Sequence, residues 1–245
     1  MDERNGVKDL HISNKFQLKP DGKAHYGNVL ISGDGYFYLE GGNELEIDRL
    51  EVKKESFHTQ YGILVKTPDG KDGAEGEPGG NAGEANSVCI TVHNLVNSVY
   101  VKGIGGNGGK GGKGRKGSCG GKGGDAVCHD TLGGNGGNGS QGGKGSCGGR
   151  GSDGPMVTII YAPADEKAEV KALSRDDEES REQKSYGGCG GEGGCGGDGG
   201  TGGKGGLNGD GLTYAENGTD GKTGPSGERG EDGKDTEMVI RRMDD

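Results

Sequence analysis

The sequence predicts a mainly β protein with a polyglycine-II helix bundle, in which β-strands alternate with long Gly-Gly-X tracts and no substantial α-helix occurs. The 245 residues include 61 glycines and only 6 prolines, and hydrophobic residues make up 27% of the chain. That hydrophobic share is too small for an apolar core along the whole length. Glycine recurs at every third position in long tracts, without the proline content of collagen. Between the tracts lie short segments in which β-branched residues alternate with polar ones.

Residues 1–67 are expected to form a β-rich N-terminal part. Its alternating segments are GNVLIS (27–32), GYFYLEGG (35–42), ELEIDRLEVKK (44–54) and HTQYGILVKT (58–67). A period of two places every second side chain on one face, as in a half-buried strand. The first residues are charged and lack an apolar stretch, so no secretory signal peptide is visible.

Residues 68–245 are expected to form a glycine-rich polyglycine-II bundle with interleaved strands at 87–103, 156–173 and 237–242. A helix with three residues per turn gives each triplet position its own face. A face made of glycine lets a neighbouring backbone approach closely and exchange hydrogen bonds with it. Gly-Gly-X triplets therefore predict two packed faces, and Gly-X-X triplets, as at 70–79 and 218–233, predict helices at the edge of the bundle.

The charged segment 174–185, SRDDEESREQKS, interrupts this pattern. It is expected to be a loop or a short helix and the most flexible piece of the chain.

The Gly-Gly-X tracts carry a resemblance to known proteins. GGNGGKGGKG, GSCGG and GGEGGCGGDGG resemble the tracts of polyglycine-II bundle proteins, such as the T-even phage tail-fibre tip adhesin and the springtail glycine-rich antifreeze protein. The resemblance covers roughly residues 70–235 and is one of architecture. It implies a bundle of polyglycine-II helices, with adhesion or ice binding as the functions of the proteins resembled.

A basic stripe lies along the first Gly-Gly-X tract. It could form an exposed binding surface for phosphate or a sulfated glycan, or it could be a solvated face countered by acidic neighbours. The net charge of −10 and the lack of aromatic residues between the basic ones argue against nucleic acid. We expect protein partners or self-association, a possible surface glycan, no specific nucleic acid and no membrane insertion. The stripe consists of Lys110, Lys113, Arg115, Lys116 and Lys122.

The chain has six cysteines. Cys189 and Cys195 fall on one face two turns apart, which is too far for a disulfide between them. Cys89 alternates into a strand and is expected to be a buried small apolar residue. Inter-helix or interchain disulfides and reduced thiols both stay open for the others, which are Cys119, Cys128, Cys147, Cys189 and Cys195.

No enzyme, cofactor or metal site is expected. Cys128, His129 and Asp130 supply a nucleophile, a base and an acid, but residues adjacent in sequence seldom point to one centre. The glycines of 103–108 have dinucleotide-binding spacing, yet a glycine tract follows where that motif needs a helix. Asp125 lies in one copy of a calcium-binding nonapeptide without a second copy, so we expect a turn residue there.

The sequence therefore predicts a non-enzymatic, rigid structural or adhesive scaffold. It would be a component of a virion fibre, a filament or a cell surface, presenting side chains and loops for binding or assembly. The expected location is extracellular, cell-surface or virion, with the cytoplasm still open. Alternatives are an ice- or carbohydrate-binding protein and a redox-sensitive interaction module.

Overall fold

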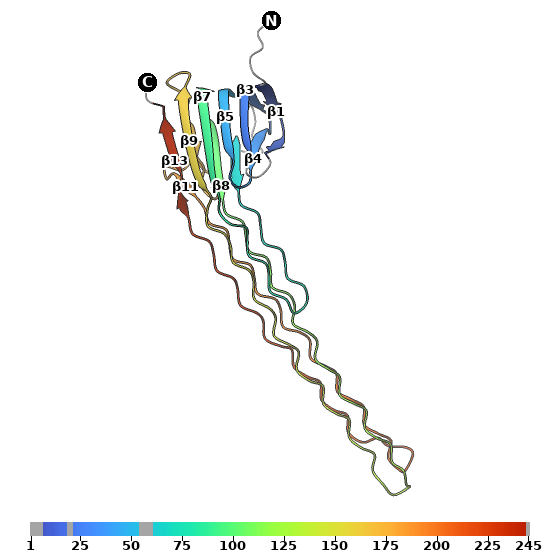
Figure 1. Cartoon of the computed structure of the whole chain (residues 1–245). Helices are drawn as coiled ribbons and strands as arrows, with labels where there is room; N and C mark the ends of the chain where they lie inside the picture. Colours follow the sequence, from blue (N-terminus) through green and yellow to red (C-terminus); the bar gives the residue numbers. More distant parts are fainter. Residues whose placement is uncertain (1–6, 19–21, 54–60, 244–245) are drawn as a thin grey trace.

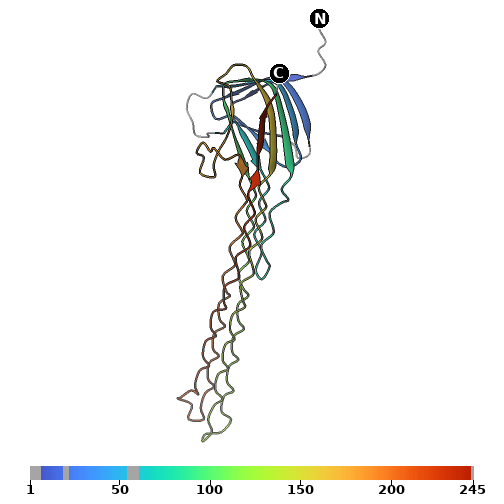
Figure 2. The ribbon, with the colours of Figure 1, turned by 90° about the vertical axis from the view of Figure 1, so that its left-hand side faces the viewer.

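A computed structural model describes residues 7–18, 22–53 and 61–243. It consists of a β head and a long, narrow projection that ends far from the head (Figures 1 and 2). We call this projection the glycine stalk. It comprises residues 67–86, 105–155 and 187–235.

The head contains two parallel sheets, and all strands within each sheet run in the same direction. The six-stranded sheet has the order β1 (Lys8–Ile12), β3 (Lys23–Ser32), β5 (Glu44–Lys53), β7 (Ser87–Val96), β9 (Met156–Pro163) and β13 (Val239–Arg242). The five-stranded sheet has the order β10 (Val170–Ala172), β8 (Val99–Ile104), β6 (Ile63–Lys66), β4 (Tyr36–Leu39) and β2 (Lys15–Gln17). A short antiparallel pair joins β11 (Lys184–Ser185) to β12 (Thr236–Glu237).

The chain alternates between the two large sheets, so each odd-numbered strand from β1 to β9 is followed by a strand of the other sheet. The head is therefore a stack of parallel coils with an apolar core between the sheets. In β5, Leu45 and Ile47 are buried while Glu44 and Glu46 are exposed, as a period of two requires. The core continues through every coil and includes Ile31, Phe37, Ile63, Ile90, Val101 and Ile159.

The glycine stalk grows from one end of the coils. Residues 67–86 connect β6 to β7, residues 105–155 connect β8 to β9, and residues 187–235 connect β11 to β12. Each of these three segments is a hairpin with one tract that leaves the head and one that returns (Figure 1). Residues 67–86 form the short hairpin, and the other two hairpins are long. The tracts therefore stand where a short turn would otherwise close a coil.

Main-chain hydrogen bonds join neighbouring tracts of the stalk at every third residue. Tracts that run in the same direction bond to one another, as where the N–H of Gly108 donates to the carbonyl of Cys189 at 2.8 Å. Tracts that run in opposite directions bond as well, as where the N–H of Gly203 donates to the carbonyl of Gly137 at 2.8 Å. The stalk thus has a layer of departing tracts and a layer of returning tracts.

Glycine is required inside the stalk because the tracts approach one another closely. A Cβ on Gly120 would lie 1.8 Å from the carbonyl oxygen of Gly137, and one on Gly108 would lie 2.0 Å from that of Gly149. These distances leave no room for any side chain.

The predicted polyglycine-II helix bundle is wrong for this structure. The described residues contain no helix, and their regular structure is β, in parallel sheets gathered in the head. The tracts are neither helices nor strands, and their main-chain hydrogen bonds run to other tracts. The mainly β character of the prediction is confirmed.

Both large sheets take strands from each side of residue 67. The division of the chain predicted at this residue stays a prediction.

Residues 174–185 form a loop that ends in β11 and includes no helix. The N–H of Ser180 in this loop donates to the carbonyl of Ala172 at 3.0 Å, so the loop covers the outer edge of β10. Within the described ranges, no helix is long and apolar enough to cross a membrane.

Candidate functional site

The far end of the glycine stalk consists of two adjacent turns, residues 125–132 and 207–214, which we call the tip. The N–H of Ala126 donates to the carbonyl of Leu207, and the N–H of Gly209 donates to the carbonyl of Thr131, at 2.8 and 2.9 Å. These bonds cross from one turn to the other. The tip is therefore one surface made by two hairpins.

Large apolar side chains gather at the tip in contact with solvent. Val127 is 96% exposed, Leu132 84%, Leu212 85% and Tyr214 68%. Among the described residues, Met156 on the head is the other exposed large hydrophobic side chain. Several exposed apolar side chains on one small surface are typical of interaction sites.

The tip is also acidic, since its two turns contain three aspartates and no lysine or arginine. Asp125 accepts a hydrogen bond from the N–H of Leu207 at 2.8 Å, and this bond, together with Lys122, lowers the pKa of its carboxyl group. Asp210 accepts bonds from Thr213 and Leu212, which likewise lower its pKa. Asp125 thus links the two turns, and Asp210 fixes the shape of its own turn.

The sequence Cys128, His129 and Asp130 lies within the tip. Its one ion pair joins His129 Nδ1 to Asp130 Oδ1 at 3.5 Å, while the main chain of Cys128 bonds to Thr131. No group of three or more metal-ligating side chains is arranged around a point in the described part of the chain. The three residues therefore lie in an exposed turn, and the prediction that they are not catalytic stays a prediction.

The predicted basic stripe lies on the outer face of the departing tracts, opposite acidic residues of the next tract. Lys110 pairs with Glu192 at 3.4 Å and Lys113 pairs with Asp198 at 2.8 Å. The hydrogen bond with Asp198 raises the pKa of Lys113.

The other members of the stripe are not one group. Lys116 lowers the pKa of Asp198, after the larger effect of Lys113, and Lys122 pairs with Asp125 at 3.2 Å. Arg115 lies at another position of its triplet, beside the turn at Gly76. Glycan binding by this stripe stays a prediction.

All six cysteines are free and exposed. The expectation that Cys89 is buried is wrong, because its neighbours Val88 and Ile90 take the inward positions of β7. The hydroxyl of Thr201 donates to Cys119 Sγ at 3.2 Å and lowers the pKa of that thiol.

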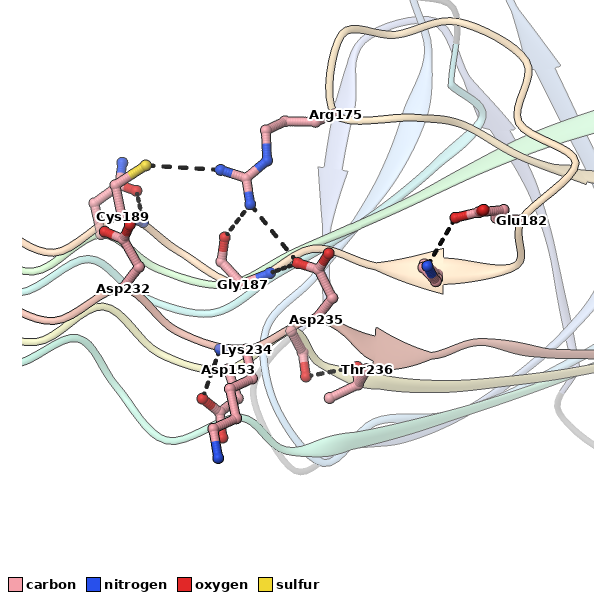
Figure 3. A network of polar contacts seen from close by, with 12 residues as sticks. Asp153, Arg175, Glu182, Gly187, Cys189, Asp232, Lys234, Asp235 and Thr236 are labelled. Atoms are coloured by element: carbon pink, nitrogen blue, oxygen red, sulfur yellow. Dashed lines mark hydrogen bonds and ion pairs between the residues drawn. The ribbon is translucent and has the colours of Figure 1, made fainter.

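The remaining cysteines are spread over the stalk. Cys189 Sγ lies 3.7 Å from Arg175 at the head end of the stalk (Figure 3). Cys128 lies in the tip, and the carbonyl of Cys147 accepts a bond from Gly79 in the short hairpin. Cys195 is exposed on the same tract as Cys189. Their redox role stays a prediction.

A polar network fixes the stalk to the head where the third hairpin begins and ends (Figure 3). Arg175 donates to the carbonyl of Gly187 at 2.8 Å and lies 3.7 Å from Asp235, which accepts a bond from the N–H of Gly187. The buried Lys102 pairs with Asp177 and donates to the carbonyl of Arg175 at 2.8 Å. The loop over β10 is thus tied to both parts.

Sequence reasoning missed a second role of the outward triplet positions. Asparagine and aspartate at these positions accept hydrogen bonds from main-chain N–H groups of the next tract. Asp72 accepts from Lys110 at 2.7 Å, and Asn107 accepts from Cys189 at 2.9 Å. The recurrence of Asn and Asp between glycines was the available signal, because short amide and carboxyl groups reach main-chain donors readily.

Comparisons with known proteins add little to this picture. No protein-family model matches the chain, and no curated protein matches it. Among solved structures, a match is the nine polyproline type II helical bundle springtail antifreeze protein from Granisotoma rainieri, at 23% identity. The match covers 68% of this chain and 92% of that chain with a TM-score of 0.14, and at this score it carries no argument about fold or function.

Proposed function

We propose that this protein is a non-enzymatic scaffold of a virion fibre, a filament or a cell surface, and that it carries a binding surface at the end of its stalk. The location and the partner class follow the expectations from the sequence. The head provides an apolar core, and the stalk separates the tip from it.

One observation carries the proposal: Val127, Leu132, Leu212 and Tyr214 are gathered at the point farthest from the head, and all are exposed. Leaving such side chains in water is unfavourable for an isolated protein, since apolar surface is stabilised by burial. A partner protein that covers the tip would remove this cost. The three aspartates of the tip favour a partner with basic groups around an apolar site.

The experiment is cosedimentation of the purified protein with intact cells or particles from the source culture. Replacement of Leu212 and Tyr214 by serine should abolish binding, and Met156→Ser on the head should leave it unchanged. High salt should weaken binding if the acidic groups contribute. Equal binding by the tip variant and the unmodified protein would contradict the proposal.

The other functions expected from the sequence stay alternatives. Thermal hysteresis above that of a control protein would favour ice binding. A change of oligomeric state with reductant would favour a redox-sensitive module, since all six thiols are exposed.

A further inference from the structure

One side of the stalk is covered along only part of its length. The short hairpin, residues 67–86, packs on the tracts 105–126 and 133–155 near the head and ends where Gly76 meets Arg115. Beyond that point the same side continues as residues 115–124 and 134–143, which we call the distal edge. It is the continuation of an interface that the chain itself forms.

Near the head, main-chain groups on this side are paired with the short hairpin. The carbonyl of Lys110 accepts a bond from Gly73 at 2.7 Å, and the carbonyl of Arg150 accepts one from Ala82 at 2.9 Å. The N–H of Gly109 donates to the carbonyl of Gly80 at 2.8 Å. The hairpin thus satisfies donors and acceptors on both layers of the stalk.

On the distal edge the equivalent groups have no such bonds within the described residues. The carbonyls of Cys119, Lys122 and Asn138 accept none, and the N–H groups of Gly121 and Gly124 donate none. These groups occupy the same triplet positions as the paired groups near the head. The distal edge therefore offers an unfinished ladder of main-chain donors and acceptors.

The residue types along this side point the same way. Gly109 and Gly112 are buried under the short hairpin. Both positions require glycine, because a Cβ there would lie 2.0 and 1.6 Å from a carbonyl oxygen of that hairpin. Where the hairpin ends, the equivalent positions carry Arg115 and Ser118. Glycine then returns at 121 and 124, although a Cβ there would meet nothing within 4 Å. No contact among the described residues requires glycine at these two positions.

We propose that the distal edge is a self-association surface and that its occupant is the distal edge of a second copy of this chain. A two-fold axis parallel to the stalk sets the departing tract of one copy against the returning tract of the other, so the facing tracts are antiparallel. Antiparallel tracts already bond in this stalk, as where the N–H of Gly137 donates to the carbonyl of Gly121 at 2.8 Å. The glycines at 121 and 124 allow the close approach that such bonds need.

Charge also permits this contact. The outward residues Asn135, Asn138 and Gln141 of the returning tract are neutral, so lysines of the departing tract face amides or solvent across the two-fold contact. The edge is short and lacks apolar side chains, and the dimer is therefore reversible and forms at high protein concentration. The edge shares no residue with the tip, so this inference is independent of the proposed binding function.

The test is sedimentation equilibrium of the full chain over a wide concentration range, with reductant present so that the exposed cysteines stay reduced. The unmodified protein should show a monomer–dimer equilibrium. Gly121→Val with Gly124→Val should weaken the dimer at least tenfold without unfolding the monomer, because both side chains enter open space. Lys222→Val, which adds the same side chain at an exposed position of the third hairpin outside the distal edge and the tip, serves as the matched control and should dimerise as the unmodified protein does.

Three results would overturn the inference. They are a monomer at every concentration, equal dimerisation by the double glycine variant, and an assembly larger than a dimer. A tip variant with serine at Leu212 and Tyr214 should still dimerise, which separates this result from a failure of the proposed binding function. Melting temperatures of the variants at low concentration should match that of the unmodified protein.

Discussion

Two adjacent glycines of the stalk should respond oppositely to the same substitution. A Cβ on Gly120 would lie 1.8 Å from the carbonyl oxygen of Gly137, while a Cβ on Gly121 would meet nothing within 4 Å. Gly120→Ala must therefore push the returning tract away. Gly121→Ala needs no movement of its neighbours.

The magnitude follows from the hydrogen bonds at this point of the stalk. Separation of the tracts breaks the bonds from Gly120 to Thr201, from Gly137 to Gly121 and from Gly203 to Gly137, each at 2.8–2.9 Å. At about 0.5–1.5 kcal/mol each, Gly120→Ala should destabilise the stalk by about 2–4 kcal/mol. Gly121→Ala should be neutral or stabilising by up to about 1 kcal/mol, because alanine restricts the unfolded chain.

Amide hydrogen exchange, measured at concentrations where the chain is monomeric, reports the stability of the stalk separately from that of the head. Protection of the amides in 133–143 should fall strongly in Gly120→Ala and stay unchanged in Gly121→Ala. Equal protection in the two variants would refute the view that close main-chain contact is what requires glycine here.

Three further outcomes are expected. The hydrogen bond that the His25 ring donates to the Asp48 carboxylate raises the pKa of His25, so this pairing stabilises the fold at low pH and its contribution is lost as the pH rises through the raised pKa. Asp48→Asn should lower that pKa in an NMR titration, and an unchanged titration would contradict the pairing. Asp177→Ala leaves the buried ammonium of Lys102 without its carboxylate and should lower the free energy of unfolding by about 1–3 kcal/mol in denaturant. Deletion of the loop 174–183 should uncover the edge of β10 and cause aggregation detectable by light scattering, whereas a stable monomer would show that the loop does not protect this edge.

Much of the head could be predicted from the sequence as strands, but not as coils. The alternation of apolar and polar residues before and after Leu50 in 44–54, and before and after Leu95 in 87–103, identifies strands. The parallel pairing of these strands depends on contacts between distant residues, such as Leu45 with Ile90. Local periodicity carries no information about such pairs.

For the stalk, the sequence indicated close main-chain contact but not the type of structure. Glycine at 108, 111 and 120 lies where a Cβ would strike another tract, as the triplet period suggested. The order of the tracts could not be predicted, because all of them have nearly the same repeat. The apolar tip was missed because Val127, Leu132, Leu212 and Tyr214 are scattered in sequence and come together only through the pairing of two hairpins.

The pairing of the long tracts restricts which insertions and deletions in the sequence can change the length of this stalk. The N–H of Gly111 bonds to Glu192 on one neighbour, and that of Ser146 bonds to Gly112 on another. An insertion of one triplet into a single tract would shift every bond beyond it by one step. Length can therefore change without loss of pairing only when all four long tracts gain or lose a triplet together, which makes the distance from head to tip a quantity that a single small insertion cannot adjust.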